Sequence, residues 1–167
     1  YYTAEIVRKN HPDAKVVFVG PCIAKRKEAR RDDLVDFVMT FEELHAIFKG
    51  MGIEMSEAQV HNIPFRSIRT AHGFAQNGGV TAAVKAHVAG TFDFKTLQVA
   101  NLTKKNVNLM RAFGKTGKAP AQFIEVMACE GGCIAGPSVI TNPRVAAIQL
   151  KKYVGDAADN ISHTVSP

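Results

Sequence analysis

Short runs of β-branched and apolar residues alternate along this chain with segments whose apolar side chains recur at a helical spacing. The clearest of these runs are residues 15–20 and 123–127, and their length and composition predict buried strands. Strands separated by helices run parallel, because each helix carries the chain back to the start of the next strand. The pattern therefore predicts an α/β fold, a mostly parallel sheet with flanking helices, in a single domain over residues 1–167.

The remaining elements follow from the same periodicity and from local start and stop signals. Thr40 and Glu43 have the spacing of a capping box, so a helix is predicted to begin at Thr40 and to end at Gly50 or Gly52. Residues 53–77 have a mixed pattern and are predicted to be rich in loops. Further helices are predicted at 2–10, 25–33, about 78–88, 104–113 and 143–153, and further strands at 35–39 and 96–102.

The charge of the chain is basic, with a formal net charge of +6 and a pI of about 9.3. The densest basic run, residues 25–31, is followed at once by Asp32 and Asp33, which favours a charge-balanced, solvated helix face over a docking surface for an acidic redox partner. Tryptophan is absent and aromatic residues make up 8%, which disfavours nucleic acid as a partner.

Membrane insertion and secretion are also disfavoured by the sequence. The longest apolar runs, such as residues 16–19, are far too short to cross a bilayer. The first ten residues lack the apolar core of a signal peptide. The expected location is therefore the cytoplasm, with no membrane partner.

The three cysteines are the residues most indicative of chemistry. An odd number without a secretory signal argues against a disulfide scaffold and leaves buried, inert thiols as the simplest alternative. Their positions favour a binding role instead. Cys22 follows the predicted strand at 15–19 and Cys129 and Cys133 follow that at 123–127, and the carboxyl ends of parallel strands are where α/β proteins bind ligands.

The four-residue spacing of Cys129 and Cys133 is a weak signal alone, although on a helix it would place both sulfurs on one face. Gly131 and Gly132 strengthen the case for an iron–sulfur cluster, because they let backbone N–H groups approach the cluster sulfides.

Two other chemistries remain as alternatives. Zinc prefers tetrahedral Cys and His sets, but no histidine lies at a finger-like spacing from a cysteine; His61, His72 and His87 are interpreted as surface or core residues. A catalytic thiol at Cys22, activated by a helix N-terminus and Lys25, lacks a His or Asp partner that the sequence could identify.

The two cysteine motifs resemble those of a known family. GPCIAKRKEA (residues 20–29) and FIEVMACEGGCIAGP (residues 123–137) are similar to the second and third motifs of the iron-only, or di-iron, hydrogenases. The segments DFVMTFEEL (36–44) and NGGVTAAV (77–84) are also similar to that family, so the resemblance covers most of the chain. It implies the catalytic-domain fold of these enzymes and an H-cluster, which is a 4Fe–4S cubane joined to a di-iron unit carrying CO and cyanide.

The resemblance also implies roles for individual residues. Cys22 and Cys129 would bind the cubane, and Cys133 would bridge the cubane and the di-iron unit. Lys25 would donate a hydrogen bond to a cyanide ligand, which makes Lys25 and Cys133 the candidate catalytic residues. Met127 would pack against the cluster. Implied partners are a ferredoxin-like electron donor or acceptor, or linked iron–sulfur domains, together with maturation proteins.

Glu28 matches a further position of the family's second motif, where the simplest role is structural, as a member of a buried ion pair.

The sequence departs from the family pattern in three places. The family's first motif, whose adjacent cysteines provide the fourth cubane ligand and a proton-transferring thiol, lies upstream of the second, and this chain begins too close to Cys22 to hold it. The chain is therefore expected to be a fragment, truncated on its N-terminal side, inactive alone and without the complete cofactor. Gly20 stands where hydrogen-producing members carry methionine, and Ala-Gly-Pro-Ser at 135–138 replaces a more glycine-rich tail. Both changes resemble divergent or sensory members.

The expected function is thus that of an anaerobic, cytoplasmic iron-only hydrogenase, catalysing reversible proton reduction and dihydrogen oxidation. Two alternatives remain: a hydrogen- or redox-sensing regulatory domain with slow turnover, and a hydrogenase-like iron–sulfur assembly protein.

Overall fold

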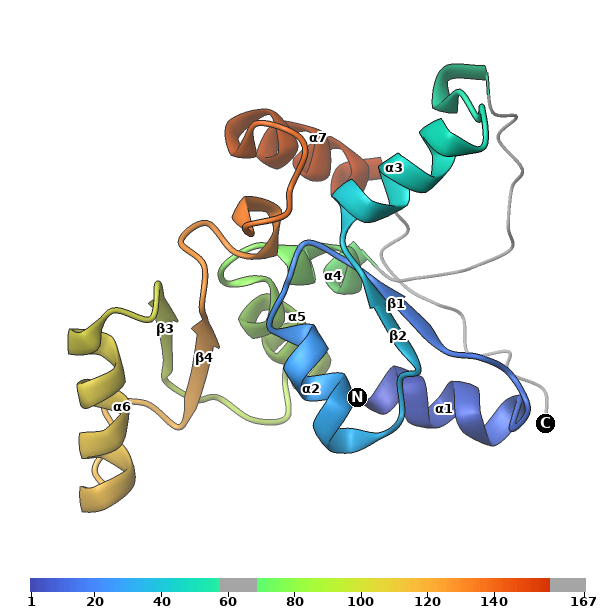
Figure 1. The fold of residues 1–167 in the computed structure, drawn as a ribbon. Helices are drawn as coiled ribbons and strands as arrows, with labels where there is room; N and C mark the ends of the chain where they lie inside the picture. The colour runs from blue at the N-terminus through green and yellow to red at the C-terminus, as the bar shows by residue number, and fades with distance from the viewer. Residues whose placement is uncertain (58–68, 157–167) are drawn as a thin grey trace. The chain divides into compact units, whose positions relative to one another are not determined.

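The computed structural model describes residues 1–57 and 69–156. The chain divides into two compact units (Figure 1). The first unit comprises Tyr1–Asn62 and Gly136–Ile140, and the second comprises Ile63–Ala135 and Thr141–Pro167. Each unit is described by itself, and the single domain expected over residues 1–167 stays a prediction.

The first unit is built on a parallel strand pair joined by a helical crossover (Figure 1). Phe18 pairs with Val38, and both side chains are half-buried on the face that α2 covers. The alternate side chains Val17, Val19 and Phe37 are exposed. The elements are α1 (Tyr2–Asn10), β1 (Val17–Val19), α2 (Lys25–Asp32), β2 (Phe37–Met39), α3 (Phe41–Gly50) and the short 3-10 helix η1 (Met55–Glu57).

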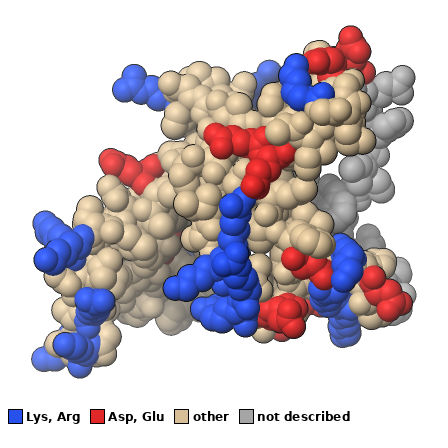
Figure 2. Space-filling view, viewed as in Figure 1, with Lys and Arg blue, Asp and Glu red and all other residues tan. Residues whose placement is uncertain are grey.

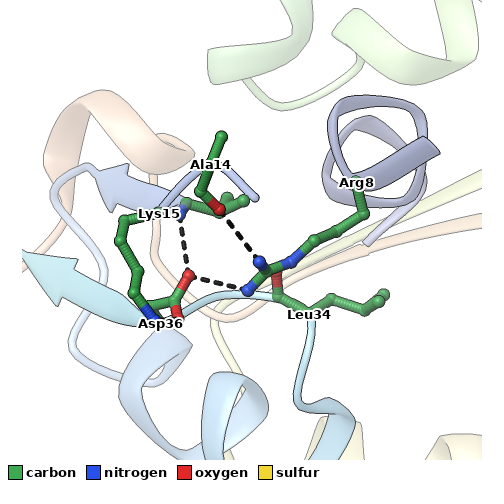
Figure 3. Close-up of polar contacts among 6 residues, drawn as sticks. Arg8, Ala14, Lys15, Leu34 and Asp36 are labelled. Carbon is green, nitrogen blue, oxygen red and sulfur yellow. Dashed lines mark hydrogen bonds and ion pairs between the residues drawn. The ribbon is translucent and has the colours of Figure 1, made fainter. Parts of the chain in front are cut away.

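Arg8 ties α1 to the segments that enter both strands (Figure 3). Its guanidinium donates to the Asp36 carboxylate at 2.7 Å, to the Ala14 carbonyl at 2.9 Å and to the Leu34 carbonyl at 3.2 Å. Asp36 also accepts from the backbone N–H of Val16 at 2.8 Å and from Lys15 Nζ at 3.1 Å. The Val16 N–H, together with Lys15 and Arg8, lowers the pKa of Asp36.

The capping box predicted at the start of α3 is confirmed. Thr40 Oγ1 accepts from the backbone N–H of Glu43 at 3.2 Å, and Glu43 Oε2 accepts from the backbone N–H of Thr40 at 2.8 Å. Both N–H groups lie in the first turn, where no carbonyl of the helix can reach them. The bond from the Thr40 N–H, followed by the contact with Arg26, lowers the pKa of Glu43.

The second unit holds a longer parallel pair, which runs in register from Thr96 opposite Phe123 to Ala100 opposite Met127. The crossover helix between the strands begins at Thr103, whose hydroxyl accepts from the Asn106 N–H at 3.2 Å, and it ends at Gly117, which has φ 65°. The elements are α4 (Arg69–His72), the 3-10 helix η2 (Gly73–Ala75), α5 (Gly79–His87), β3 (Thr96–Ala100), α6 (Lys104–Thr116), β4 (Phe123–Met127), the 3-10 helix η3 (Cys133–Ala135) and α7 (Pro143–Asp156).

The α/β class with parallel strands is confirmed, but several details differ from the sequence-based expectation. The described residues form two separate two-stranded sheets where one sheet was expected. Three strands are shorter than predicted, while α6 and α7 continue three residues further. The segment 53–77 contains short helices as well as loops, and its residues 58–68 lie outside the described part of the chain. Among the helices described, none has the length and apolar character needed to cross a membrane.

Candidate functional site

Cys22 lies between the end of β1 and the first turn of α2. The backbone N–H of Gly20 continues the strand pairing by donating to the Met39 carbonyl at 3.0 Å. Two residues later, the carbonyl of Cys22 accepts from the Lys25 N–H at 3.2 Å, which opens the helical turn that becomes α2. The half-buried Cys22, which forms no disulfide bond, therefore lies two residues before the N-cap of α2, close in sequence to the positive end of the helix dipole.

Lys25 is held on the first turn of α2 by Glu28. Its Nζ donates to Glu28 Oε2 at 2.6 Å, and the two side chains are 37% and 35% exposed. Both line a cleft of about 50 Å³ between α2 and the strands, together with Phe18 and Val38. Glu28 thus forms an ion pair, with Lys25 as its partner, but the pair is partly exposed where a buried one was expected. An ammonium group has three N–H donors, so the bond to Glu28 leaves donors for a second acceptor.

The basic residues of α2 are largely balanced by nearby carboxylates. Figure 2 shows Lys and Arg side chains gathered over this helix, with acidic groups beside them. Arg26 bonds to Glu43, and Arg31 bonds to Asp32 at 2.6 and 2.9 Å. These pairs agree with the charge-balanced face predicted from residues 25–33.

Cys129 and Cys133 are carried by a tight turn directly after β4, named here the cysteine turn (residues 129–133). The Gly132 N–H donates to the Cys129 carbonyl at 3.1 Å, which closes a four-residue turn with Gly131 at its third position. Gly131 and Gly132 both have φ +86°, a backbone conformation that side chains other than glycine rarely adopt. The two cysteines therefore do not share a helix: Cys129 is half-buried in the turn, and the exposed Cys133 begins η3.

Gly132 is buried against the segment that precedes α5. A Cβ atom at this position would lie 2.6 Å from the Ala75 carbonyl oxygen and 2.9 Å from both the Asn77 nitrogen and the Gln76 Cα. All three are backbone atoms, so no side-chain rotation could make room. Only glycine fits here, and its absence of a side chain lets the cysteine turn pack backbone to backbone.

The donor chemistry of these residues fits an iron–sulfur cluster. Thiolates are the ligands that such clusters use, and a glycine turn leaves backbone N–H groups accessible to sulfide. Cys22 belongs to the first unit, whereas Cys129 and Cys133 belong to the second. Within residues 1–57 and 69–156, the structure groups no three side chains of His, Cys, Asp or Glu as a metal site. The fit therefore rests on the residue types and on the cysteine turn.

A comparison with protein families decides the classification. The model for the C-terminal domain of iron-only hydrogenase large subunits matches residues 1–137, which include both cysteine motifs. The chain belongs to this family. The family expected from the two motifs is thus confirmed.

The curated proteins to which the chain is similar include a hydrogenase subunit and an iron-sulfur assembly component. The chain is 27% identical over 172 residues to the periplasmic [Fe] hydrogenase large subunit of Nitratidesulfovibrio vulgaris, covering 81% of this chain and 41% of the relative. It is also 27% identical over 182 residues to the cytosolic iron-sulfur assembly component 3 of Rattus norvegicus, covering 83% and 38%. The chain thus spans about two fifths of the length of these relatives.

Solved structures of [FeFe]-hydrogenases have the same fold. One that describes stepwise assembly of the H-cluster matches with a TM-score of 0.53 and 20% identity, over 89% of this chain and 55% of that one. Another, concerned with oxygen inactivation, matches with a TM-score of 0.56 and 18% identity, over 93% and 57%. Both confirm the hydrogenase-type α/β fold.

Sequence reasoning missed the role of Glu125, which lies within the second cysteine motif at residues 123–137. Glu125 lies inside β4, is only 6% exposed, and accepts hydrogen bonds from Gly78 and Thr81. A carboxylate within an otherwise apolar strand is the signal that could have indicated this role, because buried charges need partners.

The histidines interpreted as surface or core residues are placed as follows. His72 stacks on Tyr153 with ring centroids 4.6 Å apart, His87 is exposed, and His61 lies outside the described residues.

Proposed function

We propose that the full-length protein containing this chain binds an H-cluster-type cofactor and catalyses reversible proton reduction and dihydrogen oxidation. The observation that carries the proposal is the placement of the cysteines: Cys22 directly follows one parallel strand, and the cysteine turn directly follows another. These are the carboxyl ends of strands, where α/β proteins bind ligands. Membership of the iron-only hydrogenase family over residues 1–137 supports the same conclusion.

In this proposal the cysteines are the cluster ligands. Cys22 and Cys129 would hold the cubane, Cys133 would provide a thiolate for both the cubane and the di-iron unit, and Met127 at the end of β4 would pack against the cofactor. When bound, the cofactor supplies the redox and Lewis-acid chemistry. A cubane takes four ligands and the chain has three cysteines, so the fourth ligand is not a cysteine of these 167 residues.

Lys25 is the proposed donor to an anionic ligand of the cofactor. Glu28 restrains its ammonium on the first turn of α2 through the 2.6 Å contact and leaves it with further N–H groups to donate. The positive end of the α2 dipole adds to the preference for an anion at this place. Lys25 would therefore bind and orient the anionic ligand of the cofactor, while Glu28 holds Lys25 in position.

The remaining parts of the proposal concern partners and location. Electrons would come from a ferredoxin-like protein or from linked iron–sulfur domains, and dedicated maturation proteins would install the di-iron unit. We propose a cytoplasmic location; of the two relatives compared above, one is named periplasmic and the other cytosolic. Cell fractionation with an antibody against the protein tests this, and recovery in the periplasm would contradict it.

Substitution of the bridging cysteine tests the ligand assignment. The full-length protein is reconstituted anaerobically, and iron per chain is measured for wild type and for Cys133→Ala. Loss of the thiolate should lower the iron content, because the proposed bridge to the di-iron unit is gone. Ile140→Ala, an exposed residue downstream of the same motif, is the matched control and should keep the wild-type iron content. Unchanged iron in Cys133→Ala would show that Cys133 is not a ligand.

An iron–sulfur assembly protein is the second candidate, because the chain has 27% sequence identity with the assembly component of Rattus norvegicus as well as with the hydrogenase subunit. Infrared spectroscopy of the reconstituted protein separates the two. Bands of CO and cyanide, together with hydrogen uptake, are expected for a hydrogenase. A protein that holds iron but lacks these bands would be an assembly-type scaffold. Bands with very slow hydrogen uptake would instead indicate a sensing domain, consistent with Gly20 in place of the methionine of hydrogen-producing members.

A further inference from the structure

Glu125 is a buried carboxylate in the middle of β4 whose two oxygens are both hydrogen-bonded. Oε1 accepts from the Gly78 N–H at 2.8 Å, and Oε2 accepts from the Thr81 N–H at 2.9 Å and from the Thr81 hydroxyl at 2.5 Å. Thr81 is itself 4% exposed and Glu125 6% exposed. All of these groups belong to the second unit.

These bonds cap helix α5 from a strand. The helix begins after Gly78, which has φ 84° and no side chain that could accept from the first turn. Glu125 bonds the N–H of Gly78 and the N–H of Thr81, the same two positions that Thr40 and Glu43 satisfy for α3. One carboxylate thus performs both halves of a capping box, and its negative charge lies at the positive end of the α5 dipole.

The cysteine turn contacts the same stretch of chain a second time. Gly132 is seated on the backbone of residues 75–77, where even a methyl group would collide with Ala75 and Asn77. The segment 125–132, which carries Cys129, is therefore attached to the segment 75–81 at both of its ends. One attachment is the charged cap at Glu125, and the other is the backbone contact at Gly132.

We propose that Glu125 is a positioning residue for the cysteine turn: by bonding Gly78 and Thr81 it holds Cys129 and Cys133 in place on the second unit. Its effect on iron rests on the function proposed above, whereas its effect on the thiols does not. The residue acts through the backbone of β4 and the segment 75–81.

The thiol arm of the test uses metal-free full-length protein. Alkylation rates of the individual cysteines are measured by mass spectrometry in Glu125→Gln and in two variants that keep the carboxylate, Thr81→Val and Thr81→Ser. Glu125→Gln and Thr81→Val should speed alkylation of Cys129 by about tenfold, because a lost buried hydrogen bond opens the turn more often. Thr81→Ser, which keeps the hydroxyl, should restore the wild-type rate. Cys22, on the first unit, should be unaffected throughout.

Thr40→Val is the matched control, since it removes a hydroxyl from a threonine that is 5% exposed and caps α3 in the other unit. It should leave the Cys129 rate at the wild-type value. Equal rates of Cys129 in wild type and Thr81→Val, or a parallel rise at Cys22, would overturn the proposal. Should Glu125→Gln fail to fold, the comparison of Thr81→Val with Thr81→Ser decides alone.

The iron arm uses reconstituted protein and a chelator competition. Glu125→Gln and Thr81→Val should weaken iron binding by at least about tenfold, as expected when a residue that orients a metal ligand is lost. Thr81→Ser and Thr40→Val should keep the wild-type affinity. The wild type could contain no iron while Cys129 is still alkylated faster in Thr81→Val than in Thr81→Ser. That result would refute the proposed function and leave the positioning role standing. Normal iron affinity in all variants would refute the positioning role and leave the proposed function standing.

Discussion

Replacing Gly132 with alanine should destabilise the second unit far more than the same change at its neighbour Gly131. Both glycines have φ +86°, so an alanine at either position must take a positive φ, which costs about 1–2 kcal/mol. The surroundings differ. The new methyl carbon at 132 would lie 2.6 Å from a backbone oxygen, whereas at 131 its nearest neighbour is the Ala135 side chain at 3.2 Å.

The backbone overlap at position 132 adds to the conformational cost. Forcing an extra methyl group into a closely packed site costs roughly 1–3 kcal/mol, since the segment 75–77 or the cysteine turn must move. Gly132→Ala should therefore lower the free energy of unfolding by about 2–5 kcal/mol, and Gly131→Ala by about 1–2 kcal/mol. The positive φ is common to both variants, so their difference reports chiefly the contact with Ala75 and Asn77.

The measurement is urea-induced unfolding of the metal-free full-length protein, because bound metal would stabilise the native state by mass action. Gly117→Ala is a further control: its φ is 65°, it lies at the end of α6 and nothing is within 4 Å of the added methyl, so it should behave like Gly131→Ala. Equal losses for Gly131→Ala and Gly132→Ala would refute the backbone contact and the anchoring of the cysteine turn derived from it.

Two further predictions concern the first unit. The pKa of Asp36 is lowered from its ordinary value of 3.8 by the Val16 N–H, Lys15 and Arg8, so its contribution to stability is complete above that value and is lost as the pH falls through the lower, folded-state pKa. Urea midpoints measured between about pH 5 and pH 2 should therefore fall more steeply for wild type than for Asp36→Asn, and parallel slopes would contradict this. Lys25→Met breaks a partly exposed ion pair and should cost less than about 0.5 kcal/mol of stability, yet shift the cyanide bands in infrared spectra of the reconstituted protein. Lys27→Met on the same helix is the control, and unshifted bands in Lys25→Met would remove Lys25 from the site.

Some elements could be predicted because their signals are local. The capping box of Thr40 and Glu43 depends on two residues three positions apart, and the structure has both bonds. The strand at 123–127 was predicted from a short run of β-branched and apolar residues, and its predicted bounds agree with the structure. The family resemblance likewise rested on contiguous motifs, and the family model confirms it over residues 1–137.

Other features depend on partners that a sequence pattern does not specify. The strand predicted at 15–20 is only Val17–Val19, because its length is limited by pairing with the short strand Phe37–Met39. Helix α6 ends at Thr116 rather than at Phe113, because it is Gly117 that adopts the left-handed conformation and caps it. The spacing of Cys129 and Cys133 would place both sulfurs on one face only if they lay on a helix, and two successive glycines at positive φ exclude a helix there.

Helix α5 and its cap are made at different times. Thr81 and Glu125 are 44 residues apart, which corresponds to roughly 2–9 s of synthesis at 5–20 residues per second. Until β4 has been synthesised, the N–H groups of Gly78 and Thr81 lack the Glu125 carboxylate as acceptor, and Gly78 offers no side chain of its own. The residues that follow β4 are those of the cysteine turn. Capping of α5 and placement of the turn therefore depend on the same late segment of the chain.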